Sequence, residues 1–155
     1  MPSTFDDSNI PWRRLDGFDD VAFFIYKCDA ASGIVDIVYK FAPWTRQPLH
    51  RHTCPYFTLV LQGELRFYRP DGTLKEIRPT GSYVEGVVNG EPHFEGAGES
   101  EAIVFFGHRG VEDTIYLFLG ADGGPDQPLG IADVQALYDA QVADRVLARV
   151  GARPA

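Results

Sequence analysis

Short apolar runs recur along most of the chain, and glycine, proline or aspartate residues separate them. Many short runs with such boundaries predict the strands of an all-β sandwich or barrel. Pro70-Asp71-Gly72 is a typical turn, because proline fixes φ and glycine accepts a positive φ. We therefore expect a single barrel of eight or more short strands, of which the clearest lie at residues 21–27, 34–41, 56–61, 64–69, 73–78, 82–88, 101–106 and 114–119.

The C-terminal segment follows a different pattern. Most of its apolar residues are three, four or seven positions apart, which is the spacing of one helix face. We predict an amphipathic helix from Ile131 to Val150 that is closed by Gly151 and covers the barrel or contacts a partner subunit. The preceding residues 120–130 are rich in glycine, proline and aspartate and are predicted to form a loop.

The N-terminal segment is acidic and contains two candidate anchors, Ile10 and Trp12. We predict an arm that packs along the barrel or crosses to a partner subunit. The expected organisation is an arm at 1–19, a barrel at 20–120, and a loop with the C-terminal helix at 121–155. Because the arm and the apolar helix face both lack an obvious partner, and two-fold dimers are the commonest assembly, we also expect a homodimer.

The composition indicates one globular domain of 155 residues with a formal net charge of −8. This charge argues against a nucleic-acid partner, because a phosphate backbone needs clusters of lysine and arginine. No apolar run is long enough to span a membrane and no secretory signal follows Met1, so we expect a cytoplasmic protein that handles small molecules. Cys28 and Cys54 are expected to be free thiols.

His50 and His52 stand directly before the apolar run at 56–61. In an extended segment both side chains point to the same side, with Cα atoms roughly 6.6 Å apart. Two imidazoles at that spacing can bind one metal ion. Such a pair is more often a surface accident, and a third ligand must come from elsewhere in the chain, from His93 or, less plausibly, from His108.

The order His50-x-His52, Gly63, Pro79-x-Gly81 and His93 resembles the two motifs of the cupin family, over about residues 41–106. The resemblance implies a single-domain double-stranded β-helix, also called a jelly-roll barrel, that binds a metal.

Two positions depart from the common cupin pattern. The glutamate expected six residues before Gly63 is replaced by Phe57, and Val84 stands where the third histidine usually follows the Pro-x-Gly. These departures resemble the acetylacetone-cleaving and 2,4'-dihydroxyacetophenone dioxygenases. That resemblance implies a mononuclear Fe(II) site on His50, His52 and His93, with Zn or Ni as alternatives. It also implies O₂-dependent cleavage of a C–C bond in a small diketone or hydroxyketone.

Three neutral imidazoles would leave the ion with its full double positive charge, which favours an anionic chelate such as an enolate. Glu85, Tyr56 and Arg66 are candidate pocket or supporting residues, whereas Glu95 is predicted to lie on a solvated edge and His108 in a loop. Two other functions stay open. The first is a non-catalytic cupin that binds a metal or a small ligand as a sensor, and the second is a metal-dependent isomerase or decarboxylase.

Overall fold

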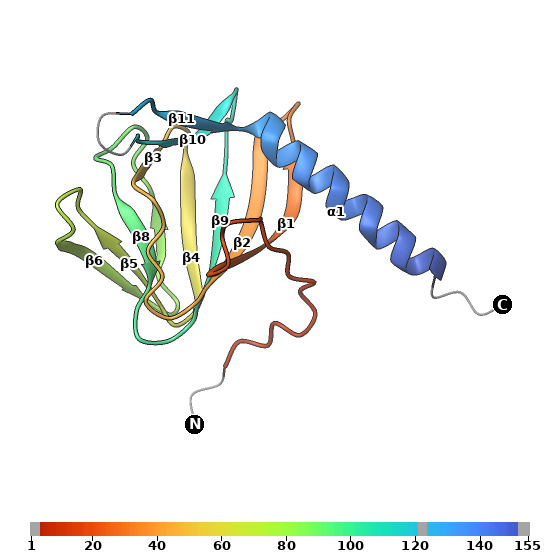
Figure 1. The fold of residues 1–155 in the computed structure, drawn as a ribbon, viewed down its shortest axis with the longest axis horizontal. Helices are drawn as coiled ribbons and strands as arrows, with labels where there is room; N and C mark the ends of the chain where they lie inside the picture. Colours follow the sequence, from red (N-terminus) through yellow and green to blue (C-terminus); the bar gives the residue numbers. More distant parts are fainter. Residues whose placement is uncertain (1–3, 121–123, 152–155) are drawn as a thin grey trace.

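Two facing β-sheets and one C-terminal helix make up the computed structural model, which describes residues 4–120 and 124–151 (Figure 1). All strand pairs are antiparallel. The elements are β1 (Val21–Asp29), β2 (Ile34–Phe41), β3 (His50–His52), β4 (Tyr56–Gln62), β5 (Glu64–Tyr68), β6 (Leu74–Pro79), β7 (Tyr83–Glu85), β8 (Phe94–Ala97), β9 (Ala102–His108), β10 (Thr114–Phe118), β11 (Gln127–Gly130) and α1 (Ile131–Gly151).

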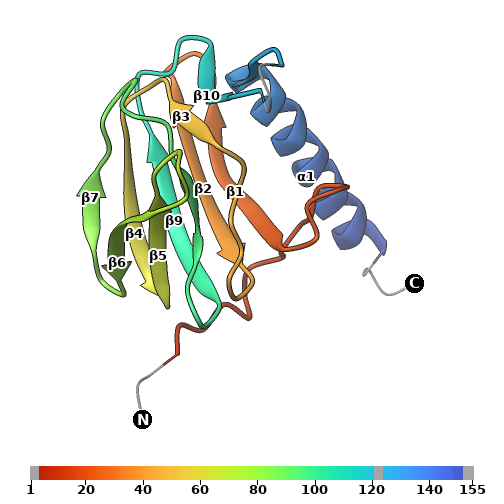
Figure 2. The ribbon, with the colours of Figure 1, turned by 60° about the vertical axis from the view of Figure 1, so that its left-hand side comes forward.

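The first sheet has five strands in the order β1-β2-β9-β4-β7. The opposite face is built from two three-stranded groups, β11-β10-β3 and β6-β5-β8, which an isolated bridge between His50 and His93 joins (Figure 2). Side chains from both faces form one buried cluster, including Val60, Leu65 and Ile115. The predicted all-β barrel with one C-terminal helix is therefore confirmed.

The side-chain pattern of β4 shows how the sequence selects its inner face. Tyr56, Thr58 and Val60 are buried, whereas Phe57 and Leu59 between them are only partly buried, as period-2 alternation requires. Gly63 then turns the chain into β5 with a φ of 69°. A side chain there would meet the carbonyl oxygen of Glu101, 2.4 Å from the position of its Cβ. The alternation along β4 and the turn at Gly63 thus set which side chains enter the barrel.

Three strands lie outside the predicted ranges, namely β3, β8 and β11. Each is only three or four residues long, so local apolar periodicity does not reveal it. Strands β3 and β8 also depend on partners that are distant in the sequence, β10 and β5. Strand β11 falls within the predicted loop at 120–130 and pairs with β10, so that prediction is wrong for Gln127–Gly130. Strand β7 covers only Tyr83–Glu85 of the range predicted at 82–88.

The N-terminal arm packs along its own barrel. Ile10 and Trp12, the two predicted anchors, lie against a small buried cluster of Phe24, Val38 and Ile103 on the outer side of the five-stranded sheet. The indole Nε1–H of Trp12 donates a hydrogen bond of 2.8 Å to the Asp7 carboxylate, which ties the arm to itself.

Two distant segments cover the free edge of β1. Arg13 of the arm exchanges backbone hydrogen bonds of 2.9 and 2.8 Å with Phe23. Two residues further along, the side chain of Gln141 on α1 accepts a bond of 3.1 Å from the Ile25 N–H and donates one of 2.7 Å to the Ile25 carbonyl. Gln141 is 2% exposed, so its amide replaces a neighbouring strand in a place without water.

Replacing Gln141 with leucine is expected to lower the free energy of unfolding by about 2–6 kcal/mol. The apolar side chain would leave two buried backbone groups of Ile25 without partners, at about 1–3 kcal/mol for each group. Urea denaturation measures the change. Gln135→Leu on the same helix is the matched control, because the Gln135 amide donates to the Asp139 carboxylate rather than to a buried backbone group. Equal stability of the two variants would contradict the role of the Gln141 amide.

The outer half of α1 carries apolar side chains that this chain does not cover. The helix projects past the barrel in Figure 1, and Val146, Leu147 and Val150 are 54%, 68% and 64% exposed. The homodimer therefore stays a prediction, with this helix face as an expected contact. Light scattering at micromolar concentration is expected to give twice the monomer mass for the native chain, and the monomer mass for Val146→Glu/Leu147→Glu.

Within the described residues, no helix is both long and apolar enough to cross a membrane.

Candidate metal centre

Four buried polar side chains converge between the two halves of the second face. His50 and His52 lie on the same side of β3, and His93 and Glu95 lie two residues apart at the start of β8. The His50–His93 bridge, with backbone bonds of 3.0 and 2.9 Å, sets the two pairs opposite each other. One nitrogen or oxygen atom from each side chain then lies within 4.8 Å of the other three.

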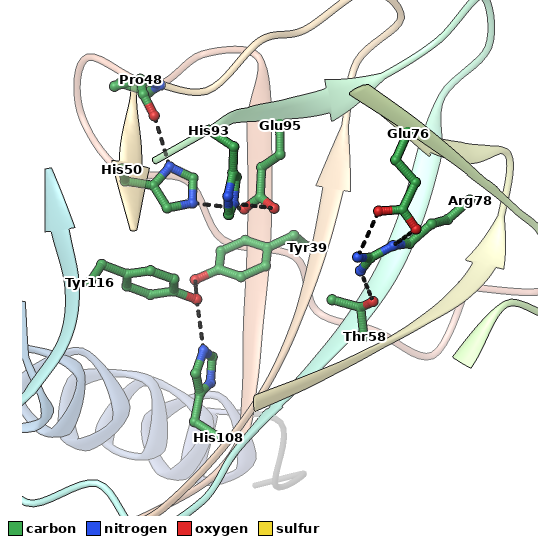
Figure 3. A network of polar contacts seen from close by, with 10 residues as sticks. All are labelled: Tyr39, Pro48, His50, Thr58, Glu76, Arg78, His93, Glu95, His108 and Tyr116. Carbon is green, nitrogen blue, oxygen red and sulfur yellow. Dashed lines mark hydrogen bonds and ion pairs between the residues drawn. The ribbon is translucent and has the colours of Figure 1, made fainter. Parts of the chain in front are cut away.

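The cluster contains polar atoms that have no hydrogen-bond partner. His50 Nε2, both ring nitrogens of His52, His93 Nε2 and Glu95 Oε2 are all buried and unpaired. The Glu95 carboxylate lies 3.3 Å from His50 Nε2 and 3.7 Å from His93 Nε2 (Figure 3). Leaving such atoms unpaired costs stability, whereas imidazole nitrogens with a carboxylate oxygen are ligands of divalent transition metals. The donor set therefore fits a divalent metal ion.

A backbone contact orients one of these imidazoles. His50 Nδ1 lies 2.8 Å from the carbonyl oxygen of Pro48, so Nδ1–H donates and the lone pair of Nε2 faces the cluster (Figure 3). Metal-binding histidines commonly hold their second nitrogen in this way. Residues 43–48 interrupt the strand pattern and begin and end with a proline. The carbonyl of the second proline, Pro48, thus fixes the tautomer of His50.

Burial and mutual charge set the protonation of the cluster. Burial alone would raise the pKa of Glu95, but His50 and His93 stabilise its charge and bring the pKa well below its usual value. Burial lowers the pKa of His52 well below 6.5. Burial also disfavours a charged His50, but Glu95 and the Pro48 carbonyl outweigh it, so the pKa of His50 is raised. A proton on His50 therefore competes with a metal ion for this imidazole.

Glu95 corrects the prediction of a solvated acidic edge. Its side chain is buried, and it faces the histidines because it follows His93 by two positions in an extended segment. The spacing His93-x-Glu95 repeats that of His50-x-His52, and this was the available sequence signal. Glu95 also supplies the carboxylate that is missing at Phe57. Phe57 itself points to the outer face, where it packs against Tyr83 and Phe105.

The other candidate residues occupy different places. Tyr56, next to Phe57, faces inward and stacks on His52 with ring centroids 3.6 Å apart. Glu85 is exposed at the end of β7, at the wall of a cavity described below. Arg66 points away from the cluster, where it binds Glu64 and lies 5.1 Å from the Trp44 ring. Arg66 is not among the residues that line the two cavities described below.

His108 and Cys54 are both buried outside the cluster. His108 ends β9 rather than lying in a loop, and its Nε2 is 3.0 Å from the Tyr116 hydroxyl. Its ring lies 6.2 Å from that of His52, and it is not among the four converging residues. Cys54 is a free thiol, 3% exposed, and burial raises its pKa to about 11.

The free energy of unfolding is expected to fall by about 3 kcal/mol between pH 7 and pH 4 because of His108 alone. Burial lowers the pKa of His108 from 6.5 to about 4, so the unfolded chain takes up the proton first as the pH falls. His108→Gln removes this titrating group. In urea denaturation, its free energy of unfolding is expected to fall by about 3 kcal/mol less than that of the native protein between pH 7 and pH 4. An identical loss in both proteins would show that His108 titrates normally in the folded state.

A cavity of about 360 Å³, the polar chamber, reaches the cluster from one side at His52 and His93. Arg78 lies in its wall, is 8% exposed, and donates to Glu76 at 2.9 and 3.1 Å and to Thr58 Oγ1 at 2.9 Å (Figure 3). The sequence had not singled out Arg78. The remaining lining residues are Arg51, Tyr56, Phe67, Lys75, Glu76, Val84, Glu85, Gly86, Val87, Gly90 and Glu91.

A second cavity of about 180 Å³, the apolar chamber, reaches the cluster at His50 and Glu95. Its other lining residues are mostly apolar, and they come from the arm, from β1, β2, β10 and β11, and from the segment before β3. These residues are Leu15, Phe18, Val21, Phe23, Tyr39, Phe41, Gln47, Tyr116, Phe118 and Leu129. The cluster thus borders two chambers of different polarity.

Solved structures with the same architecture have the cupin fold. An RmlC-like cupin protein from Ralstonia eutropha JMP134 has a TM-score of 0.71 at 18% identity, over 99% of this chain and 91% of that one. An acetylacetone dioxygenase from Acinetobacter johnsonii has a TM-score of 0.64 at 14% identity, over 90% of this chain and 91% of that one. The DMSP lyase DddQ from Ruegeria pomeroyi DSS-3 has a TM-score of 0.58 at 18% identity, over 73% of this chain and 62% of that one. No protein-family model and no curated protein matches the chain. The predicted cupin resemblance is confirmed for the fold.

Proposed function

We propose that this protein is a mononuclear metal enzyme, an Fe(II) dioxygenase that cleaves a C–C bond of a small diketone or hydroxyketone. The single observation that carries the proposal is the convergence of unpaired, buried imidazole and carboxylate atoms beside two cavities. The likeness to an acetylacetone dioxygenase supports the choice of reaction, since that protein shares the fold over most of both chains.

The charge of the centre suits a chelating enolate. Glu95 is ionised, so with neutral imidazoles a bound divalent ion would leave one net positive charge rather than the two expected for three histidines. One positive charge matches one enolate anion. Fe(II) held by His50, His52, His93 and Glu95 would supply chelation of the enolate and activation of O₂.

The residues of the chain itself bind and orient. Tyr56 covers one face of the His52 ring and excludes water from it. Arg78 is held by Glu76 and Thr58 and by the Phe67 ring, 4.1 Å away, so its guanidinium is fixed in the polar chamber. A fixed guanidinium can hydrogen-bond a carbonyl or anionic oxygen of a ligand that enters there.

Oxygen consumption tests the proposal. The protein is loaded with Fe(II) without air, its metal content is measured, and O₂ uptake is followed with acetylacetone and with 2,4'-dihydroxyacetophenone. We expect uptake that matches the amount of cleaved product, and none from His93→Ala at equal protein concentration. Binding of these compounds without O₂ uptake would favour a ligand-binding cupin, and their anaerobic conversion would favour an isomerase or a decarboxylase.

A further inference from the structure

We propose that the apolar chamber binds an aryl or branched-alkyl substituent of the chelating ligand, and that the N-terminal arm forms part of this subsite. The inference rests on the proposed function, since it concerns the ligand of the same centre. It assigns the two cavities to different parts of the ligand.

The apolar chamber borders the cluster. His50 and Glu95, two of the four converging residues, form part of its wall. A substituent of a ligand that is chelated at the cluster therefore lies next to the chamber and can extend into it. The polar chamber meets the other two imidazoles, His52 and His93, so one ligand can contact both cavities.

The size and lining of the chamber select the chemistry of this group. Its volume of about 180 Å³ exceeds the roughly 150 Å³ of an apolar protein cavity that holds benzene. Phe23 and Phe41 are buried in its wall, and Phe118 and Leu129 are partly buried. These four side chains cannot hydrogen-bond, and the hydroxyls of Tyr39 and Tyr116 in the same wall lie 3.5 Å from each other. A charged group beside this apolar part of the wall would lose its hydration without compensation.

The arm supplies the outer wall. Leu15 and Phe18 line the chamber and remain 40% and 44% exposed, which places them at its opening. The arm is held in place by the Arg13–Phe23 backbone bonds, and Phe23 itself lines the chamber. An ion pair of 2.7 Å between Arg13 and Asp144 also ties the arm to α1. The arm is thus fixed where it can contact a ligand.

A matched pair of diketones tests the subsite. Acetylacetone and benzoylacetone carry the same chelating group and differ by one phenyl in place of a methyl. Binding to the Zn(II)-loaded protein is followed by the ultraviolet spectrum of the bound enolate. We expect benzoylacetone to bind the native protein about tenfold more tightly or better, because the phenyl leaves water for an apolar cavity.

Two kinds of variant separate the chambers. Leu129→Trp fills the apolar chamber, and Leu15→Ala/Phe18→Ala opens it, so both are expected to remove most of the preference for benzoylacetone while acetylacetone binds as before. Val84→Trp is the control, because it fills the polar chamber and is expected to leave the ratio of the two affinities unchanged. Circular dichroism and zinc content check that each variant is folded and loaded.

The possible outcomes distinguish this inference from the proposed function. Equal affinities in the native protein, or a preference that survives Leu129→Trp, would overturn the subsite while chelation stands. A further titration of the metal-free protein with benzene, followed by NMR, probes the chamber alone. Benzene binding that Leu129→Trp abolishes, without binding of either diketone, would support the chamber and reject the chelating ligand. No binding of benzene or of either diketone would overturn both.

Discussion

Alanine in place of His50, His52 or His93 is expected to lower the affinity for Fe(II) or Zn(II) by more than about 100-fold. Loss of a group that merely orients a metal ligand already costs about 10–100-fold, and these side chains present the ligand atoms themselves. Competition with a chromogenic chelator measures the affinity.

His108→Gln is the matched control for the alanine series. It removes the fourth histidine of the chain, which is equally buried but lies outside the cluster. Its metal affinity is expected to stay within a few-fold of the native value. If His108→Gln lost the metal while His93→Ala kept it, the third ligand would be His108 and the proposed centre would be wrong.

Glu95→Gln is expected to lower the metal affinity by about 10–100-fold and to lower the pKa of His50 in the metal-free protein. Burial opposes the charge on His50, and the Glu95 carboxylate is the main influence that raises its pKa. Without that carboxylate, burial disfavours the proton, so protonation of His50 shifts to lower pH. Imidazole resonances in an NMR titration report this shift directly.

Glu99→Gln provides the control, because Glu99 is exposed and lies outside the cluster. It is expected to change neither the metal affinity nor the pKa of His50. A native metal affinity in Glu95→Gln would mean that the carboxylate neither binds the metal nor orients the histidines that bind it. An unchanged pKa of His50 would contradict the electrostatic coupling between the two side chains.

The sequence predicts those parts of the fold that depend on local pattern. The apolar run at 56–61, the turn at Gly63 and the helical spacing after Ile131 are all patterns within a few residues, and the structure contains each of these elements. Strands β3 and β11 depend on β10, which is far away in the sequence for β3. No periodicity within three or four residues encodes such pairing.

The site illustrates the same limit. His50 and His52 are recognisable because they stand close together before a strand, but Glu95 becomes a neighbour only through the His50–His93 bridge. Its burial could not be predicted from a stretch with three glutamates between 95 and 101. Counting six residues back from Gly63 places the usual cupin glutamate at Phe57. In the structure, however, the neighbouring Tyr56 is the side chain that β4 turns inward.

The covered edge of β1 restricts how copies of this protein can associate. An uncovered edge strand is a template on which a strand of another chain can add, and proteins limit this hazard with short or blocked edges. Arg13 and Gln141 occupy the hydrogen-bonding groups of Phe23 and Ile25, and the opposite edge of the sheet is the three-residue strand β7. Self-association by a sheet continuing across Phe23–Ile25 of β1 is therefore blocked, so a dimer that forms on this side of the molecule would have to use side-chain surfaces instead.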